Sequence, residues 1–266
     1  MAFDCPTLLD ALSAWSSAHL ALRYPDFRYA SLQHRGRTLA GLGAAIKSNS
    51  MSNEMCLAVA MAMCSMETIS EATSRGWADH LAGAAAALQS KSSQVNSSDT
   101  RLDDERLRSF EGKWLLRNFA YHDILMSVSL DRRPFRTGDY WMSTDDSIAD
   151  PYFGLASRIL FFISEISVLN ADCADRIASS SQDGFSPGAF PAVDESQEWE
   201  NDTLLHRARS LAKDLQEWIC PPAKAEEGSL AYLSETYRGA ALIYLDRVLR
   251  KYFPCNVVEI LPIFND

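Results

Sequence analysis

Residues 155–169 read LASRILFFISEISVL, and this stretch decides the fold class. Its regularly spaced apolar residues step by four, three, four and three positions: Leu155, Ile159, Phe162, Ile166 and Leu169. That spacing places the five side chains on one face of an α-helix. The run contains Arg158 and Glu165, so it is too short and too charged to span a bilayer. The stretch therefore predicts an amphipathic helix with one face buried in a protein core.

Helical spacing continues on both sides of this stretch, and no strand meander is predicted. Further helices are predicted at 6–22, from 25 through 46, at 55–69, 77–88, 103–130, 203–219 and 229–253. Ser50 to Ser52 offer caps for the helix at 55–69. The sequence thus predicts an all-α fold, a single array of about eight or nine helices forming one domain over residues 1–266.

In three of these helices the spacing places a set of mostly apolar side chains on one face, and for the helix at 103–130 that face is predicted to point inward. The first carries Leu8, Leu12, Trp15 and His19 on one face. The helix at 103–130 has an apolar stripe made of Leu107, Phe110, Trp114, Tyr121, Leu125 and Val128. The last helix has a stripe made of Leu230, Leu233, Tyr237, Ala241, Tyr244, Val248 and Tyr252.

Residues 179–202 differ from the rest in composition. They carry Asp and Glu but no Lys or Arg, and they contain two glycines and two prolines. This composition predicts a flexible acidic loop. Its aromatic residues Phe185, Phe190 and Trp199 leave two interpretations open, a plain surface loop or an activation segment that contacts a coactivator.

Charge and cysteine usage exclude several classes of protein. The 266 residues contain 25 basic and 35 acidic side chains, a net charge of −10, which argues against direct DNA contact. No signal peptide and no membrane span are predicted. The six cysteines have no pair at C-x₂₋₄-C spacing, so free thiols in a reducing compartment are expected.

A search for catalytic chemistry assigns no residue. The five histidines lie beyond helical reach of one another, and there is no nucleophile elbow or glycine-rich phosphate loop. Asp103, Asp104 and Glu105 point around a helix rather than along one face, so they do not predict a magnesium diphosphate site. We therefore expect no catalytic residues, no metal site and no cofactor in this chain.

Two clusters keep alternatives open. One combines methionines and cysteines, which line an adaptable apolar ligand pocket or simply fill the core: Met51, Met55, Cys56, Met61, Met63, Cys64 and Met66. No ligand-binding residue is assigned from it. The other cluster is basic and forms a solvated face, a partner surface or internal ion pairs such as Arg117 with Asp123. Its members are Arg101, Arg106, Arg108, Lys113, Arg117, Arg132, Arg133 and Arg136.

Four short blocks carry a family resemblance. WADHLAGA at 77–84 resembles the W-x-x-H-L-x-G-A signature of the fungal-specific transcription factor domain. FAYHD at 119–123 with RRP at 132–134 is similar to that family's F-x-Y-H-D…R-R-P block. DPYFGL at 150–155 followed by ISEI at 163–166, and YRGAALIYL at 237–245, resemble two later blocks. The blocks occur in the family's order.

The resemblance implies a regulatory and effector region of a fungal transcription factor, acting in the nucleus on RNA polymerase II transcription. It implies coregulators or a second subunit as partners and, in some relatives, a small ligand; here a small apolar ligand is expected. His80, His122 and Asp123 are interpreted as structural. The family's zinc ions belong to an N-terminal cluster absent from these residues, and members usually continue past this length. The expectation is therefore a fragment or a regulator without its own DNA reader.

Two other functions remain open from the sequence. One is an all-α enzyme acting on an apolar substrate, which a converging set of polar side chains in a pocket would favour. The other is a DNA-free scaffold that binds another regulator through a helix-in-groove contact. A closed core or a purely apolar cavity favours the regulator over the enzyme.

Overall fold

The computed structural model describes residues 4–70, 76–89, 109–142, 150, 152–182, 203–221 and 228–261. Every regular element in these residues is a helix, apart from an isolated bridge between Asp150 and Gly154. The prediction of an all-α fold is confirmed. The helices are α1 (Pro6–Ala21), α2 (Phe27–Ser48), α3 (Asn53–Ile69), α4 (Gly76–Gln89), α5 (Phe110–Ser129), α6 (Ser157–Gln182), α8 (Thr203–Glu217), α9 (Gly228–Tyr252), the 3₁₀-helix η4 (Pro254–Asn256) and α10 (Val257–Ile260).

The chain divides into two compact units, Met1–His122 and Asp123–Asp266. The boundary falls inside α5, so the first turns of that helix belong to the first unit and its last turns to the second. The single domain over residues 1–266 stays a prediction.

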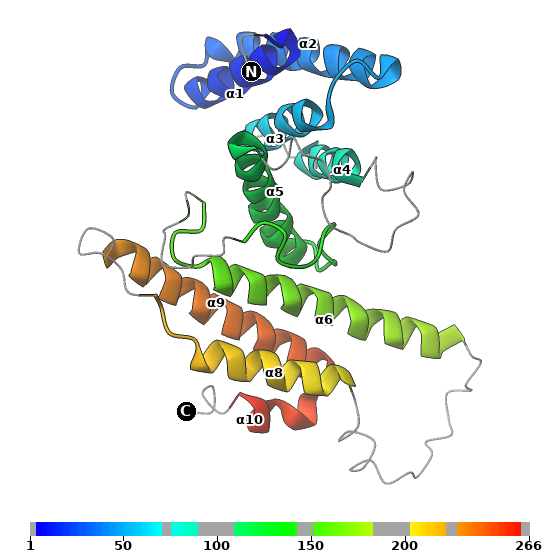
Figure 1. Ribbon diagram of the computed structural model, residues 1–266, viewed down its shortest axis with the longest axis vertical. Coiled ribbons are helices and arrows are strands. Elements are labelled where there is room, and N and C mark those ends of the chain that lie inside the picture. The colour runs from blue at the N-terminus through cyan, green and yellow to red at the C-terminus, as the bar shows by residue number, and fades with distance from the viewer. Residues whose placement is uncertain are drawn as a thin grey trace. The chain divides into compact units, whose positions relative to one another are not determined.

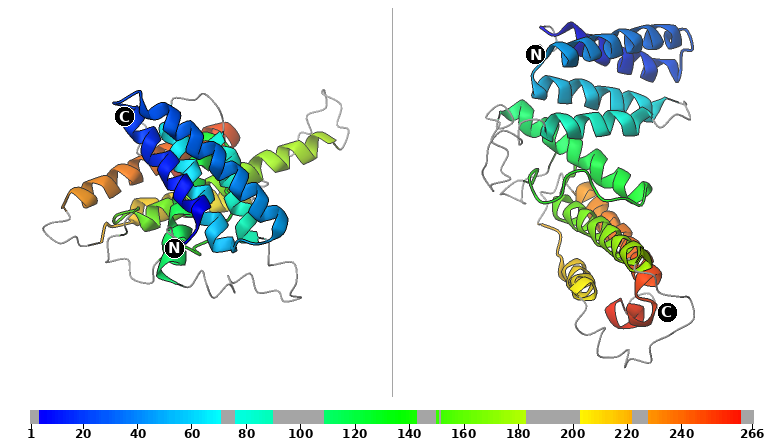
Figure 2. Two further views of the ribbon diagram at one scale, coloured as in Figure 1. Left: turned by 90° about the horizontal axis from the view of Figure 1, so that it is seen from above. Right: turned by 90° about the vertical axis from the view of Figure 1, so that its right-hand side faces the viewer.

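In the first unit, α1 packs against α2 and α3, and α3 packs against α4. Figures 1 and 2 both show α1 and α2 side by side. Alanines on the buried face of α1 allow this close approach, and Ser31 on α2 donates a hydrogen bond to the Ala14 carbonyl at 3.1 Å. A Cβ at Gly41 would lie 2.7 Å from Thr7 Oγ1, so glycine is needed where α2 crosses the start of α1.

Helix α3 forms the core of the first unit. It begins at the predicted cap, because Ser52 Oγ accepts a hydrogen bond from the Met55 backbone N–H at 3.2 Å. From Leu57 to Glu67 every side chain is buried, so the helix is enclosed on all sides. Full burial of each large apolar side chain contributes about 1.5–3 kcal/mol, so the buried residues of α3 stabilise this unit.

The predicted inward stripe of α5 is wrong, because none of its described residues is buried; Tyr121, Leu125 and Val128 are half-buried. Phe110 is 82% exposed and Trp114 is also exposed, whereas Leu115, Phe119 and Ile124 are buried. Leu107 lies outside the described residues. The pattern was ambiguous because apolar residues occupy several faces of this helix, and tertiary packing selected the face one residue further along.

In the second unit, the predicted face of α6 is confirmed. Leu155, Ile159, Phe162, Ile166 and Leu169 are all buried. Helix α6 packs against α8 and α9, and Figure 1 shows the three helices together. The stretch that predicted the fold class is thus the core helix of this unit.

The face of α9 and the start of the acidic loop need correction. Ala241, Tyr244 and Val248 are buried as predicted, but Leu233 is exposed. Helix α6 continues to Gln182, so the first residues of the predicted loop at 179–202 are helical. Residues 183–202 lie outside the described part of the chain.

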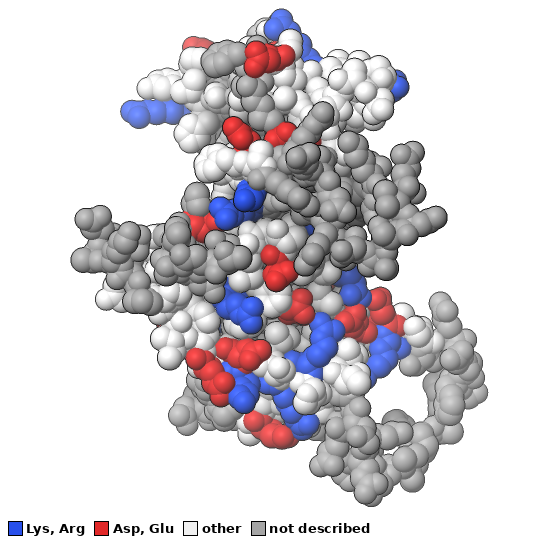
Figure 3. Space-filling view, viewed as in Figure 1, with Lys and Arg blue, Asp and Glu red and all other residues white. Residues whose placement is uncertain are grey.

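Charged side chains of both signs alternate over α6, α8 and α9 in Figure 3. Arg133 and Arg207 both pair with Asp172, at 2.6 Å each. Such interleaving screens each charge locally and leaves no field of a single sign on that face. Among the described helices, none combines the length and the apolar character that crossing a bilayer requires.

Candidate ligand-binding cavity

An open cavity of about 350 Å³ lies in the first unit, where α1, α3 and α5 contribute side chains. The predicted face of α1 supplies one wall through Leu8, Leu12 and Trp15, whereas His19 does not line it. Small-molecule pockets have volumes of roughly 300–1,000 Å³, so the cavity has the size of a site for a small ligand.

The first turns of α5 supply the opposite wall. Phe110 and Trp114, the two exposed residues of the predicted inward stripe, both line the cavity. Their side chains are exposed because they border this open cavity and do not pack in the core. Aromatic side chains such as Trp15 and Trp114 give a ligand a large apolar contact area.

Besides Ser65, Asn118 is a buried polar residue that lines this cavity. Its side chain is only 7% exposed, and its Oδ1 atom has no hydrogen-bond partner among the described residues. A buried acceptor without a partner costs about 1–3 kcal/mol. The Oδ1 atom itself is buried, so the surface that the cavity offers a ligand is mainly apolar.

The remaining polar lining consists of Ser65 and Glu111. Glu111 is exposed, and no other titratable side chain lines the cavity among the described residues. There is therefore no set of converging acids and bases in the described lining. The geometry suits binding of an apolar molecule better than acid–base chemistry.

Most residues of the methionine and cysteine cluster do not line the cavity. Only Met61 lines the cavity. Met63, Cys64 and Met66 are buried in the core, and burial raises the pKa of the Cys64 thiol to about 12. Met51, Met55 and Cys56 are half-buried and do not line it. Most of the cluster is core packing.

His80 lies in a polar cluster that joins three helices of the first unit. The buried Glu67 carboxylate accepts from Arg35 Nε at 2.8 Å, and His80 Nε2 lies 3.9 Å from the same oxygen. Burial lowers the pKa of His80, although the neighbouring Glu67 acts in the opposite direction. The histidine of the WADHLAGA block thus helps to hold α4 against α3 and α2.

His122 and Asp123 also have structural partners. His122 Nδ1 lies 2.9 Å from the Asn118 carbonyl, and burial lowers its pKa. In the second unit, the Asp123 carboxylate accepts from the Phe135 backbone N–H at 3.0 Å and from that of Arg136 at 3.1 Å. This carboxylate explains the FAYHD and RRP blocks, because it fixes the loop that contains RRP.

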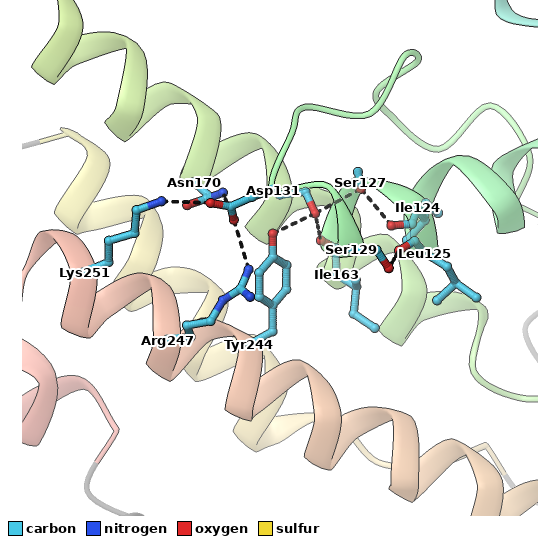
Figure 4. Close-up of polar contacts among 11 residues, drawn as sticks. Ile124, Leu125, Ser127, Ser129, Asp131, Ile163, Asn170, Tyr244, Arg247 and Lys251 are labelled. Carbon is cyan, nitrogen blue, oxygen red and sulfur yellow. Dashed lines mark hydrogen bonds and ion pairs between the residues drawn. The ribbon is translucent and has the colours of Figure 1, made fainter. Parts of the chain in front are cut away.

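Asp131 anchors a second polar cluster, drawn in Figure 4. Its carboxylate accepts from Asn170 on α6 at 2.8 Å, and from Arg247 at 3.0 Å and Lys251 at 2.9 Å on α9. The hydrogen bond from Lys251 lowers the pKa of Asp131. Nearby, the buried Ser167 hydroxyl lies 3.2 Å from Tyr244 Oη. These contacts tie α6 and α9 to the end of α5.

The other predicted candidates form no site in the described residues. Asp103, Asp104 and Glu105 lie outside the described part of the chain, as do Arg101, Arg106 and Arg108. Among the residues that the structure describes, no three His, Cys, Asp or Glu side chains could hold a metal ion together.

Sequence reasoning did not single out Asn118 or Asp131. The available signal for Asn118 was an asparagine close to apolar residues on both sides, Leu116 and Phe119. No sequence signal identified Asp131, because its partners are 39 to 120 positions away.

Comparisons with known proteins give one match. Residues 1–256 match the family described as the fungal specific transcription factor domain. No curated protein and no solved structure matches the chain. The family match covers both units and includes all four sequence blocks, and the family is one of transcription regulators. The chain belongs to the fungal specific transcription factor domain family.

Proposed function

We propose that this chain is a ligand-responsive regulatory domain that controls RNA polymerase II transcription in the nucleus. Family membership supports a role in transcription regulation. The observation that carries ligand response is the mainly apolar cavity lined by α1, α3 and α5. Its ligand is a small, mainly apolar molecule.

The coupling between ligand and output follows from where the cavity lies. Its walls come from three helices, so a ligand that contacts all three stabilises their packed arrangement. A ligand shifts an equilibrium only by its difference in affinity for the two states. Here the favoured state is the one in which α1, α3 and α5 pack around the ligand.

In this proposal, a segment or subunit outside these 266 residues makes the contact with DNA. The net charge of −10 opposes binding to a phosphate backbone. A regulatory role in transcription places the protein in the nucleus, with coregulators or a second subunit as its partners. The mainly apolar lining of the cavity favours this role over the alternative of an enzyme.

A reporter assay tests the regulatory role. The chain is fused to a heterologous DNA-binding domain and expressed in yeast with a reporter that carries its operator. We expect reporter output to differ from that of the DNA-binding domain alone. Equal output from both proteins would contradict the regulatory role.

Fluorescence of N-phenyl-1-naphthylamine tests the cavity. This neutral probe brightens in apolar surroundings and carries a single N–H donor. Leu12→Trp should fill the cavity and weaken binding by about tenfold, whereas Leu9→Trp should leave it unchanged because Leu9 is exposed and does not line the cavity. Equal Kd values for both variants would reject the cavity as the site.

A further inference from the structure

Helix α2 has its largest apolar side chains on the outside. Its buried residues are the small Ser31, Thr38 and Ala45. In contrast, Tyr29 is 75% exposed, Leu32 59%, Leu39 42% and Ile46 62%. An ordinary amphipathic helix has the reverse arrangement, with the large apolar residues buried. The packing of α2 in the first unit therefore leaves a large apolar surface unused.

The exposed residues are regularly spaced. Together with two glycines they step by three, four, three, four and three positions: Tyr29, Leu32, Gly36, Leu39, Gly43 and Ile46. This is the heptad spacing by which one helix packs along another. We call these six residues the α2 stripe. It extends over about 26 Å at 1.5 Å per residue, enough for a long helix to pack along it.

The two glycines support a role outside the packed unit. A Cβ at Gly36 or at Gly43 would meet nothing within 4 Å among the described atoms, unlike at Gly41. Each glycine lowers helix stability by about 1 kcal/mol relative to alanine. No contact within the unit requires them, but glycine lets the backbone of a second helix approach closely.

Charge selects the kind of partner. Helix α2 carries Arg28, Arg37 and Lys47 and no Asp or Glu, in a chain whose net charge is −10. The fourth cation of the helix, Arg35, pairs with the buried Glu67 of the same unit. Arg28 precedes Leu32 by four positions and Lys47 follows Gly43 by four, so both border the α2 stripe. Pairing with a second copy of α2 would bring like charges together.

We propose that the α2 stripe docks an amphipathic helix of a partner protein, with apolar residues at heptad spacing and Asp or Glu at the flanking positions. The apolar residues pack onto Leu32, Leu39 and Ile46, and its backbone approaches the glycines. The acidic residues lie beside Arg28 and Lys47. This contact gives the regulatory domain a coregulator surface that does not depend on the ligand cavity.

A designed peptide serves as the probe. It has about four heptads with Leu at a and d and Glu at e and g, and its twin has Lys in place of Glu. Binding to the purified full chain is measured by fluorescence anisotropy without added ligand. We expect the Glu peptide to bind and the Lys peptide to bind about tenfold more weakly or not at all.

Matched variants locate the contact. Leu32→Glu with Leu39→Glu should weaken Glu-peptide binding by about tenfold or more. Gln33→Glu with Ala44→Glu introduces the same charges on exposed positions outside the stripe and should weaken it much less. Equal binding of the two peptides, or equal effects of the two double variants, would overturn the proposal.

Replacing the two glycines separates their effect on helix stability from their effect on binding. Gly36→Ala with Gly43→Ala should raise the Tm, because alanine favours helix, and should weaken peptide binding.

Light scattering tests whether a second copy of this chain, and not a partner helix, occupies the α2 stripe. If the wild type is a dimer that Leu32→Glu with Leu39→Glu converts to monomer, the stripe binds a second copy and the proposal fails.

Discussion

Arg132 donates a hydrogen bond to the buried carboxylate of Asp123 at 3.0 Å, which places the two charges of the FAYHD and RRP blocks in one ion pair. Asp123 is 1% exposed, and two backbone N–H groups of the following loop complete its coordination. Because burial raises the pKa of Asp123, the ionised carboxylate depends on these partners. The pair explains both blocks without a catalytic role.

Removal of this carboxylate should destabilise the second unit. Asp123→Ala leaves Arg132 and the N–H groups of Phe135 and Arg136 without their acceptor. We expect a loss of about 3 kcal/mol in the free energy of unfolding, measured by urea denaturation. The exposed Asp139 in the same loop is the control, and Asp139→Ala should cost less than about 0.5 kcal/mol. Similar losses would contradict the assignment.

The Arg35–Glu67 pair should behave as a coupled unit. Arg35→Ala leaves the buried carboxylate of Glu67 with His80 as its nearest basic partner, so we expect a loss of about 2–3 kcal/mol after allowance for the partial exposure of Arg35. The double variant with Glu67→Ala should lose less than the sum of the single losses. Additive losses in a double-mutant cycle would show that the pair contributes no coupling.

Two asparagines should respond in opposite directions to replacement by leucine. Asn118→Leu removes a buried acceptor that has no partner among the described residues and should raise the free energy of unfolding by about 1 kcal/mol. Asn170→Leu also removes an Oδ1 atom without a partner among the described residues, but it breaks the 2.8 Å hydrogen bond from Nδ2 to the Asp131 carboxylate, so we expect it to lower the free energy of unfolding by about 1 kcal/mol. The chemical change is the same, so urea midpoints that move in the same direction would refute the distinction.

Two substitutions of Asp131 separate the effect of backbone geometry on stability from the effect of its charge. Its φ of 51° lies in the left-handed region, at the turn where the Arg132 N–H bonds to the Ser127 carbonyl and ends α5. Asp131→Ala and Asp131→Gly both remove the carboxylate, but only alanine keeps a Cβ at this φ. We expect the alanine variant to be less stable by about 1 kcal/mol in thermal unfolding. Equal Tm values would contradict backbone strain.

Acidification should destabilise the first unit. The pKa values of His80 and His122 are lowered by burial from the ordinary 6.5, so the unfolded chain binds more protons than the folded chain below that pH. Their contribution to stability is fully present above pH 6.5 and is lost as the pH falls below it. Urea midpoints at about pH 7.5 and about pH 5.5 measure the loss. His80→Gln with His122→Gln should flatten the profile, and an unchanged slope would contradict this origin.

The local pattern of the sequence determined the class of fold and several helix limits. The apolar steps of residues 155–169 fixed the buried face of α6, and Ser52 fixed the start of α3, because both depend on neighbours within a turn or two. The family blocks likewise identified the family before any contact was known.

Tertiary structure decided which face of an ambiguous helix is buried. Leu32 and Leu39 of α2 and Phe110 and Trp114 of α5 are apolar, yet they are exposed, while Ser31 and Thr38 are buried. The cavity beside Asn118 and the partners of Asp131 likewise depend on residues far apart in the chain. Apolar spacing shows which side chains share a helix face, but only the packing of the other helices determines whether that face is covered.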